Sequence, residues 1–125
     1  MVNVLIVPAD DTRPMRHMDL DPTYQAASMC LNAHSLDNVF LPDTNGVLTN
    51  AHSKQYGGSV NARATQLVEF FVPGFALRDV ITGDAVFVGF SIDSTAYPAI
   101  YTDVSHDVLA VADARFGARR LAPVA

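Results

Sequence analysis

The feature that most constrains the fold is the apolar stretch from Val80 to Phe90, interrupted by a turn at Gly83-Asp84. Its second half, Ala85-Val86-Phe87-Val88-Gly89-Phe90, carries no polar side chain, whereas a strand with one solvated face alternates polar and apolar residues. Such a run belongs in the interior of a sheet. We therefore expect residues 80–81 and 85–90 to form a buried hairpin that packs at the centre of the core.

Four further segments have the composition of strands. The β-branched segment from Val2 to Pro8 is followed, after a turn, by alternating polar and apolar residues from Arg13 to Leu20, which predicts an antiparallel opening hairpin. Residues 36–41 and 47–51 predict strands on either side of a turn at 43–46, where an Asn-Gly pair tolerates positive φ.

Three segments predict helices. Asp21-Pro22 suits the N-cap and first position of a helix over 23–33, and Asn61 can cap a helix over 62–71. A third helix is expected over about 98–116, followed by a small basic patch at Arg119-Arg120. The residues expected on the apolar faces are Tyr24, Ala27, Met29, Cys30 and Leu31 in the first helix, Ala64, Leu67, Val68 and Phe71 in the second, and Ile100, Val104, Val108, Val111 and Ala112 in the third.

These elements predict one domain that spans residues 1–125. A chain of 125 residues that is 50% apolar can bury a core of its own, and no repeat or linker divides it. The predicted fold class is α+β, with a mostly antiparallel sheet and two or three helices packed on one face.

Charge and cysteine content restrict the partners. The formal net charge of −5 argues against a surface that binds nucleic acid through its phosphates. Cys30 is the only cysteine, so no intrachain disulfide can form, which suits a reducing cytosol. The apolar run from Val4 to Val7 is too short for a signal peptide or membrane span, so we expect no membrane partner and residence in the cytoplasm.

No constellation of residues predicts catalysis, a metal site or a cofactor. The histidines stand too far apart for a metal site on one element, and adjacent Ser105, His106 and Asp107 cannot form a triad on one helix. The aspartates of the first turn and of the second strand's end are expected to stay apart and to act as turn formers and caps. The residues weighed for these roles are His17, His34, His52, His106, Asp10, Asp11, Asp19 and Asp21.

The candidates for binding lie between residues 52 and 65. The polar, glycine-rich segment 52–58 suits an exposed recognition loop, and its glycine amides could bind an anion together with the start of the following helix. Arg63 opposes the helix dipole there, which indicates an anionic ligand or, in the favoured interpretation, a structural salt bridge to Asp79 or Asp84. The candidate ligand or partner-binding residues are Tyr56, Gly57, Gly58, Asn61, Arg63 and Thr65.

Four sequence patterns, taken together, resemble a known family. They are Val4-Leu5-Ile6-Val7-Pro8, the Arg-x-x-Asp-Leu-Asp pattern of residues 16–21, Asn61-Ala62-Arg63-Ala64-Thr65, and the Asp-Val-Ile-x-Gly-Asp-Ala-Val-x-Val-Gly pattern of residues 79–89. The chain is similar over about residues 2–90 to the family called domain of unknown function 3846, and residues 97–118 would form a helical extension. Members occur in actinobacteriophages and other mobile elements. The resemblance implies a small accessory protein made in an infected bacterial cell and implies no reaction.

Two kinds of function follow from these observations. The first is a non-enzymatic phage protein that binds a host or defence protein in the bacterial cytoplasm. The alternative is a protein that binds or sequesters a nucleotide or other anionic small molecule, with a pocket that could lie between two copies of the chain. A flat apolar patch would favour the first, and a tight pocket with convergent amides the second. An enzyme of unknown reaction is third.

Overall fold

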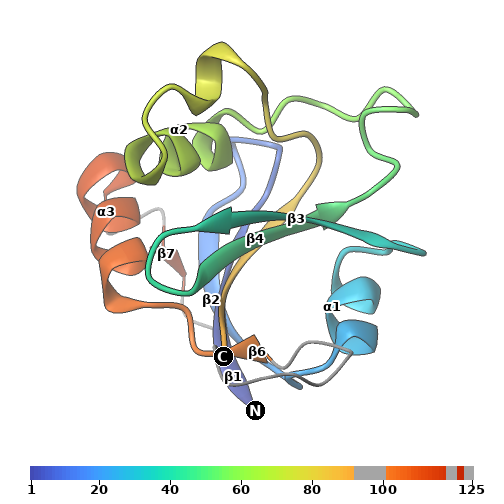
Figure 1. Ribbon diagram of the computed structural model, residues 1–125, viewed down its shortest axis with the longest axis vertical. Helices are drawn as coiled ribbons and strands as arrows, with labels where there is room; N and C mark the ends of the chain where they lie inside the picture. The colour runs from blue at the N-terminus through green and yellow to red at the C-terminus, as the bar shows by residue number, and fades with distance from the viewer. Residues whose placement is uncertain (92–100, 118–120, 123–125) are drawn as a thin grey trace.

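The structure is a computed structural model that describes residues 1–91, 101–117 and 121–122. In the described part of the chain, seven strands form one sheet in the order β3-β4-β5-β1-β2-β7, and β6 pairs with β5 (Figure 1). All pairs are antiparallel except β2 with β7. The strands are β1 (Val2–Val7), β2 (Met15–Leu20), β3 (Leu36–Leu41), β4 (Asn45–Asn50), β5 (Ala85–Phe90), β6 (Tyr101–Thr102) and β7 (Leu121–Ala122).

Strand β5 lies inside the sheet, as its composition predicts. It pairs with β4 on one side and with β1 and then β6 on the other, and its residues from Ala85 to Val88 are fully buried. The predicted hairpin between 80–81 and 85–90 is wrong. Residues 80–81 form no strand with β5, because Asn61 and Thr65 bind the backbone of Ile81 while Thr82 forms an isolated bridge with Val60.

The opening hairpin is confirmed, because β1 and β2 pair from Val2 opposite Leu20 to Ile6 opposite Arg16. The second hairpin is also confirmed, but its turn differs from the prediction. Positive φ falls on Asp43 and Thr44, and the Asn-Gly pair belongs to β4. A Cβ on Gly46 would lie 2.2 Å from Phe90 Cε2, so packing against the Phe90 side chain, not turn geometry, favours glycine there.

Three α-helices lie in the described residues, and each has a side-chain N-cap. Helix α2 (Ala62–Phe71) has the predicted cap, bounds and buried side, and is followed by a 3₁₀ turn, η1 (Phe75–Leu77). Helix α1 (Tyr24–Cys30) is shorter than predicted, and α3 (His106–Phe116) begins later than predicted.

The errors at α1 have a local cause. Thr23, not Asp21, is the N-cap, because Thr23 Oγ1 accepts a hydrogen bond from Ala26 N at 3.1 Å. The helix ends early because Asn32 adopts positive φ and the Ala33 amide bonds back to Ser28 O. The predicted apolar face is only partly right, since Ala27 is buried whereas Met29 is 74% exposed.

The third helix starts at Ser105, whose Oγ caps Val108 N. The predicted start was wrong because Tyr101–Thr102 form β6 against the end of β5, and Val104 N donates to Asn3 O in an extended segment. The part of the predicted helix at 98–100 and the basic pair Arg119-Arg120 lie outside the described residues.

Helices cover the sheet from both sides. Helices α2 and α3 pack on one face, as predicted, whereas α1 covers part of the other (Figure 1). The predicted α+β class and mostly antiparallel sheet are confirmed. The core on the α2 and α3 face includes Leu5, Val7, Met15, Val47, Ala64, Leu67, Val68, Phe87, Val108 and Ala112, and the core on the α1 face includes Val4, Ile6, Leu20, Ala27, Leu48, Val86, Val88 and Tyr101.

Candidate functional site

Asn61 ties the start of α2 to two other segments of the chain. Its side chain is fully buried, and its Oδ1 accepts a hydrogen bond from Ala64 N at 3.0 Å as the helix cap. Its Nδ2 donates to Val7 O at 2.8 Å and to Gly83 O at 2.9 Å. One side chain therefore joins α2, the end of β1 and the segment before β5.

Thr65 and Arg63 extend this attachment. Thr65 Oγ1 donates to Asn61 O at 2.8 Å and accepts from Ile81 N at 2.9 Å. Arg63 is 5% exposed, and its Nη2 donates to Pro8 O at 2.9 Å and Asp10 O at 3.0 Å. We call Asn61, Arg63 and Thr65 the α2 anchor, because each holds the start of α2 to neighbouring backbone.

The predicted salt bridge from Arg63 to Asp79 or Asp84 is replaced by these carbonyl contacts. Asp79 pairs with Lys54, and Asp84 Oδ1 accepts a hydrogen bond from Ala9 N at 2.9 Å. The hydrogen bond from Lys54 lowers the pKa of Asp79. The stabilisation from this pair is therefore fully present above the usual carboxyl pKa, and it is lost as the pH falls through the lowered pKa of Asp79. Both side chains are about half exposed, so the contribution is small.

The glycine loop does not present its amides to a ligand. Gly57 N donates to Lys54 O at 3.3 Å and Gly58 N to Ser53 O at 2.6 Å, so both amides are used within the loop. Gly57 has a φ of +74°, and a Cβ on Gly58 would collide with Ser53. The glycines therefore shape the loop. Tyr56 is 79% exposed, with its ring 6.0 Å from that of His52.

The six candidate residues thus form two groups. Asn61, Arg63 and Thr65 are buried and hydrogen-bonded to backbone, whereas Tyr56, Gly57 and Gly58 lie on an exposed loop. Asp10 acts as the predicted turn former, because its Oδ1 accepts hydrogen bonds from Thr12 N and Oγ1, and the latter bond above all lowers its pKa. Among the described residues, no group of three His, Cys, Asp or Glu side chains is placed to hold a metal ion.

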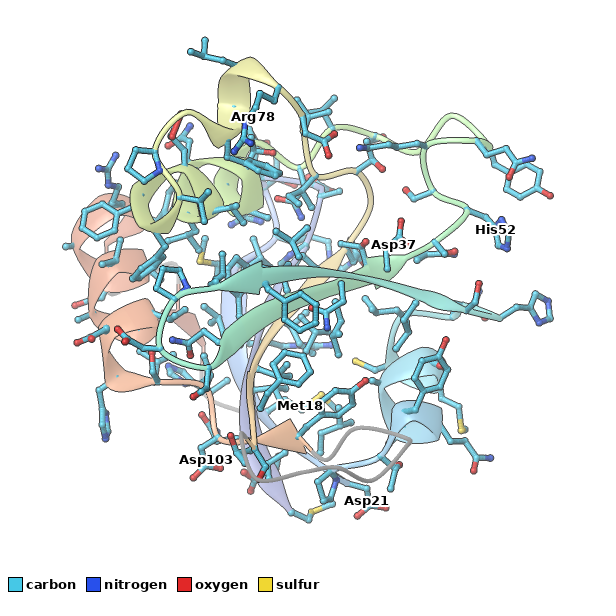
Figure 2. All side chains as sticks on the ribbon, viewed as in Figure 1. Met18, Asp21, Asp37, His52, Arg78 and Asp103 are labelled. Carbon is cyan, nitrogen blue, oxygen red and sulfur yellow. The ribbon has the colours of Figure 1, made fainter. Side chains whose placement is uncertain are left out.

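Replacing Arg63 by alanine is expected to lower the free energy of unfolding by about 2 kcal/mol, because two carbonyls lose a charged donor. Arg63→Met keeps most of the buried aliphatic length and should show a similar loss. The exposed Arg78, labelled in Figure 2, provides the control, and Arg78→Ala should change stability by less than about 0.5 kcal/mol. Urea denaturation measures all three. Unchanged stability of Arg63→Ala together with loss of ligand or partner binding would instead place Arg63 in a binding site.

Two surface features escaped the sequence analysis. The first is the edge of β3, where Phe40 is 73% exposed and its ring centroid lies 5.7 Å from that of Phe90. The alternation of side chains along residues 36–41 could have indicated that Phe40 is exposed, because Phe40 lies on the same face of the strand as the polar Asn38. In the described residues, β3 lies at one end of the strand order and pairs with β4 alone.

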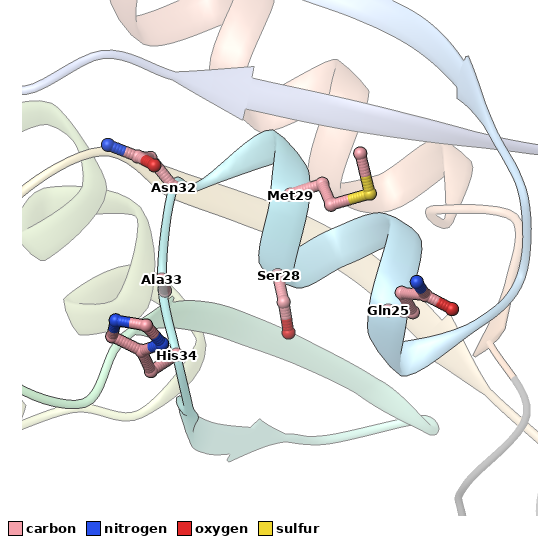
Figure 3. A pocket seen from close by; sticks show the side chains of 6 residues that line it. All are labelled: Gln25, Ser28, Met29, Asn32, Ala33 and His34. Carbon is pink, nitrogen blue, oxygen red and sulfur yellow. The ribbon is translucent and has the colours of Figure 1, made fainter.

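The second feature is a hollow of about 320 Å³ beside α1, which we call the α1 hollow (Figure 3). Its wall contains the Ser28 side chain, which is 9% exposed. The hollow was not predicted, because the predicted helix continues through residues 31–33, where the chain in fact turns. The lining residues are Gln25, Ser28, Met29, Asn32, Ala33 and His34.

Comparison with known proteins gives a structural likeness alone. No protein-family model matches the sequence, and no curated protein matches it either. A solved structure of the small RNA methyltransferase HEN1 superposes on 86% of this chain with a TM-score of 0.62 at 14% identity. The match spans 15% of that protein's chain, so it shows a shared fold and carries no activity to this one. None of the described helices has the length and apolar character needed to cross a bilayer.

Proposed function

We propose that this protein is a non-enzymatic, bacteriophage-encoded accessory protein that binds a host protein in the bacterial cytoplasm, with the edge of β3 as its contact surface. The observation that carries the proposal is the outer position of β3 with Phe40 exposed beside it. The phage setting rests on the sequence patterns that resemble domain of unknown function 3846.

The register of the hairpin identifies the backbone groups that a partner would meet. Ala51 N donates to Ser35 O, and hydrogen-bonded pairs alternate along an antiparallel ladder. The amides of Asp37, Val39 and Leu41 therefore face β4, and those of Leu36, Asn38 and Phe40 face outward. The outward-facing Leu36 N donates a hydrogen bond to Tyr24 Oη at 2.8 Å, so it is already paired within the chain. We call the outward backbone of Asn38 and Phe40 the β3 edge.

Aromatic side chains support binding at this edge. The ring of Phe40 contacts that of Phe90, and Phe90 lies 5.5 Å, centroid to centroid, from the buried Tyr101. An apolar row thus runs from the core out to the β3 edge on the α1 face. A partner strand that pairs with the edge could also cover Phe40, combining main-chain hydrogen bonds with burial of an aromatic ring.

Charge indicates the chemistry of the partner. Asp37 and Asp43 are exposed on β3 and its turn, residues 36–43 carry no basic side chain, and the whole chain has a net charge of −5. Figure 2 shows Asp37 on the side of β3 opposite to α1. An extended host segment with lysine or arginine beside apolar residues complements this edge. The exposed Tyr56 remains a candidate for a peripheral contact.

A photo-crosslinking amino acid at Phe40 in an actinobacterial lysate tests the proposal. We expect a host protein to be captured from position 40 and not from the exposed Gln66 of α2. Asn38→Pro removes an outward amide and leaves the bonds to β4, so it should abolish capture, whereas Asn38→Thr should retain it. Asp37→Lys should weaken capture at least about fivefold through charge repulsion.

Three results would contradict this function. They are equal capture from positions 40 and 66, capture that survives both Asn38→Pro and Asp37→Lys, and a crosslink from position 40 to a second copy of the chain. Thermal unfolding of each variant separates loss of binding from loss of folding, and Asp37→Lys provides the test if the proline variant unfolds.

A further inference from the structure

The β3 edge offers a partner strand a short and bounded length of backbone. In an antiparallel ladder the amide and carbonyl of one residue point to the same side, so both groups of Asn38 and of Phe40 face outward. At one end of the edge, Leu36 N already donates to Tyr24 Oη. At the other end, Pro42 has no amide hydrogen, and its carbonyl accepts a hydrogen bond from a side chain of β4 at 3.1 Å. A strand that pairs fully with this edge therefore does so opposite Asn38 and Phe40.

The side chains of β3 differ between the two faces of the sheet. Asn38 and Phe40 lie on the α1 face, where the Phe40 ring is 73% exposed and contacts that of Phe90. Asp37 and Val39 lie on the face of α2 and α3, where Val39 is partly buried against the core and Asp37 is exposed (Figure 2). The edge is thus aromatic on one face and, three residues earlier, acidic on the other.

The direction of the partner strand fixes the order of its side chains. All pairs in the described sheet except one are antiparallel, and antiparallel pairing is the more stable per residue. If one residue of an antiparallel partner lies opposite Phe40, the next three lie opposite Val39, Asn38 and Asp37 in turn. Residues directly opposite one another share a face, so these four positions meet an exposed ring, a partly buried valine, a carboxamide and a carboxylate.

We propose, on the basis of the docking proposed above, that the host segment carries an aromatic, an apolar, a polar and a basic residue in this order from its N-terminal side, paired antiparallel with β3. We call this order the partner motif. The aromatic ring covers Phe40, and the lysine or arginine pairs with Asp37 across the strands. Moving the basic residue by one position places it on the α1 face, away from Asp37. The spacing therefore distinguishes the motif from a general attraction between a basic peptide and an acidic protein.

Three peptides of one composition, with blocked termini, test the order. The first, Thr-Phe-Val-Thr-Lys-Thr, carries the partner motif; Thr-Phe-Val-Lys-Thr-Thr moves the lysine by one position, and Thr-Lys-Thr-Val-Phe-Thr reverses the sequence. Each is titrated into the ¹⁵N-labelled full-length chain. We expect the first to cause saturable shifts at the amides of Asn38 and Phe40, and the other two to bind about threefold more weakly or less, the effect of losing one cross-strand ion pair.

A charge exchange identifies the contact with the carboxylate. Asp37→Lys should weaken binding of the first peptide at least about threefold, and it should favour a version of that peptide with glutamate in place of lysine. Asp19→Lys is the control, because it changes the net charge equally at an exposed position of β2 and should leave the preference for lysine over glutamate unchanged.

The peptides and the crosslinking experiment fail in different ways. Equal binding of the three peptides, a lysine preference that Asp37→Lys leaves intact, or absence of shifts at Asn38 and Phe40 while position 40 still captures a host protein would overturn the partner motif alone. Loss of specific capture from position 40 would contradict the proposed function itself and the motif with it.

Discussion

Asn61→Ala is expected to lower the free energy of unfolding by about 4 kcal/mol, the larger of the two largest effects anticipated in this protein. The substitution removes the cap on Ala64 N, which is worth about 1 kcal/mol in typical helices. It also leaves Val7 O and Gly83 O without the Nδ2 donor, at about 1–3 kcal/mol for each buried group. Urea denaturation with a fixed m-value measures the loss.

Two variants show which of these contacts carries the effect. Asn61→Asp keeps a cap acceptor for Ala64 N but lacks the donor for Val7 O and Gly83 O, so it should remain strongly destabilised. Ser105→Ala removes only the cap hydrogen bond from Val108 N to Ser105 Oγ, and should lower the free energy of unfolding by about 1 kcal/mol. If Asn61→Ala lowers the free energy of unfolding no more than Ser105→Ala does, the hydrogen bonds from Asn61 to Val7 O and Gly83 O contribute nothing to stability.

Gly89→Ala is expected to lower the free energy of unfolding by about 3 kcal/mol, since it overpacks a site where backbone must move. A Cβ on Gly89 would lie 2.4 Å from Thr102 Oγ1 and 2.5 Å from Asp103 O. Val104 N, next along the chain, donates to Asn3 O at 2.8 Å. Displacing Asp103 therefore disturbs two contacts: the pairing of β6 with β5, and the hydrogen bond from Asn3 N at the start of β1 to Asp103 Oδ1.

The position of the collision can be tested separately. Adding Thr102→Ala to Gly89→Ala removes the hydroxyl but not the clash with Asp103 O, so the double variant should recover only part of the loss. Gly57→Ala serves as the control, because a Cβ there meets nothing within 4 Å and the cost of its positive φ is about 1 kcal/mol. Equal stability of Gly89→Ala and the wild type would show that residues 102–103 do not pack this closely against β5 at Gly89.

These two residues bear on how the sequence patterns are interpreted. Asn61 belongs to the Asn-Ala-Arg-Ala-Thr pattern and Gly89 ends the pattern of residues 79–89, and both make contacts internal to the fold. The β3 edge proposed for binding lies outside both patterns. These two patterns thus specify how the chain packs, and the proposed contact depends on residues that precede both of them.

The local elements were predictable where one physical signal acted alone. Asn61 and the apolar spacing after it fixed the bounds of α2, and the composition of 85–90 placed β5 inside the sheet. The prediction failed where tertiary contacts competed with local pattern. Residues 80–81 are apolar enough for a strand, but the α2 anchor binds their backbone, and Tyr101–Thr102 extend along β5 where helical spacing suggested a helix.

The candidate site shows the same division. The sequence singled out Arg63 as unusual, but it could not show that the Pro8 and Asp10 carbonyls accept hydrogen bonds from its Nη2, because those contacts join residues more than fifty positions apart. Nor could it show that, among the residues the structure describes, the Ser28 hydroxyl lacks a hydrogen-bond partner and β3 lies at one end of the strand order. Hydrophobic periodicity and capping determined α2, the two confirmed hairpins, the α+β class and the buried strand, because they act over a few residues. Strand order, the attachment of α2 and the position of the β3 edge were decided only by tertiary structure, because they depend on which distant segments meet.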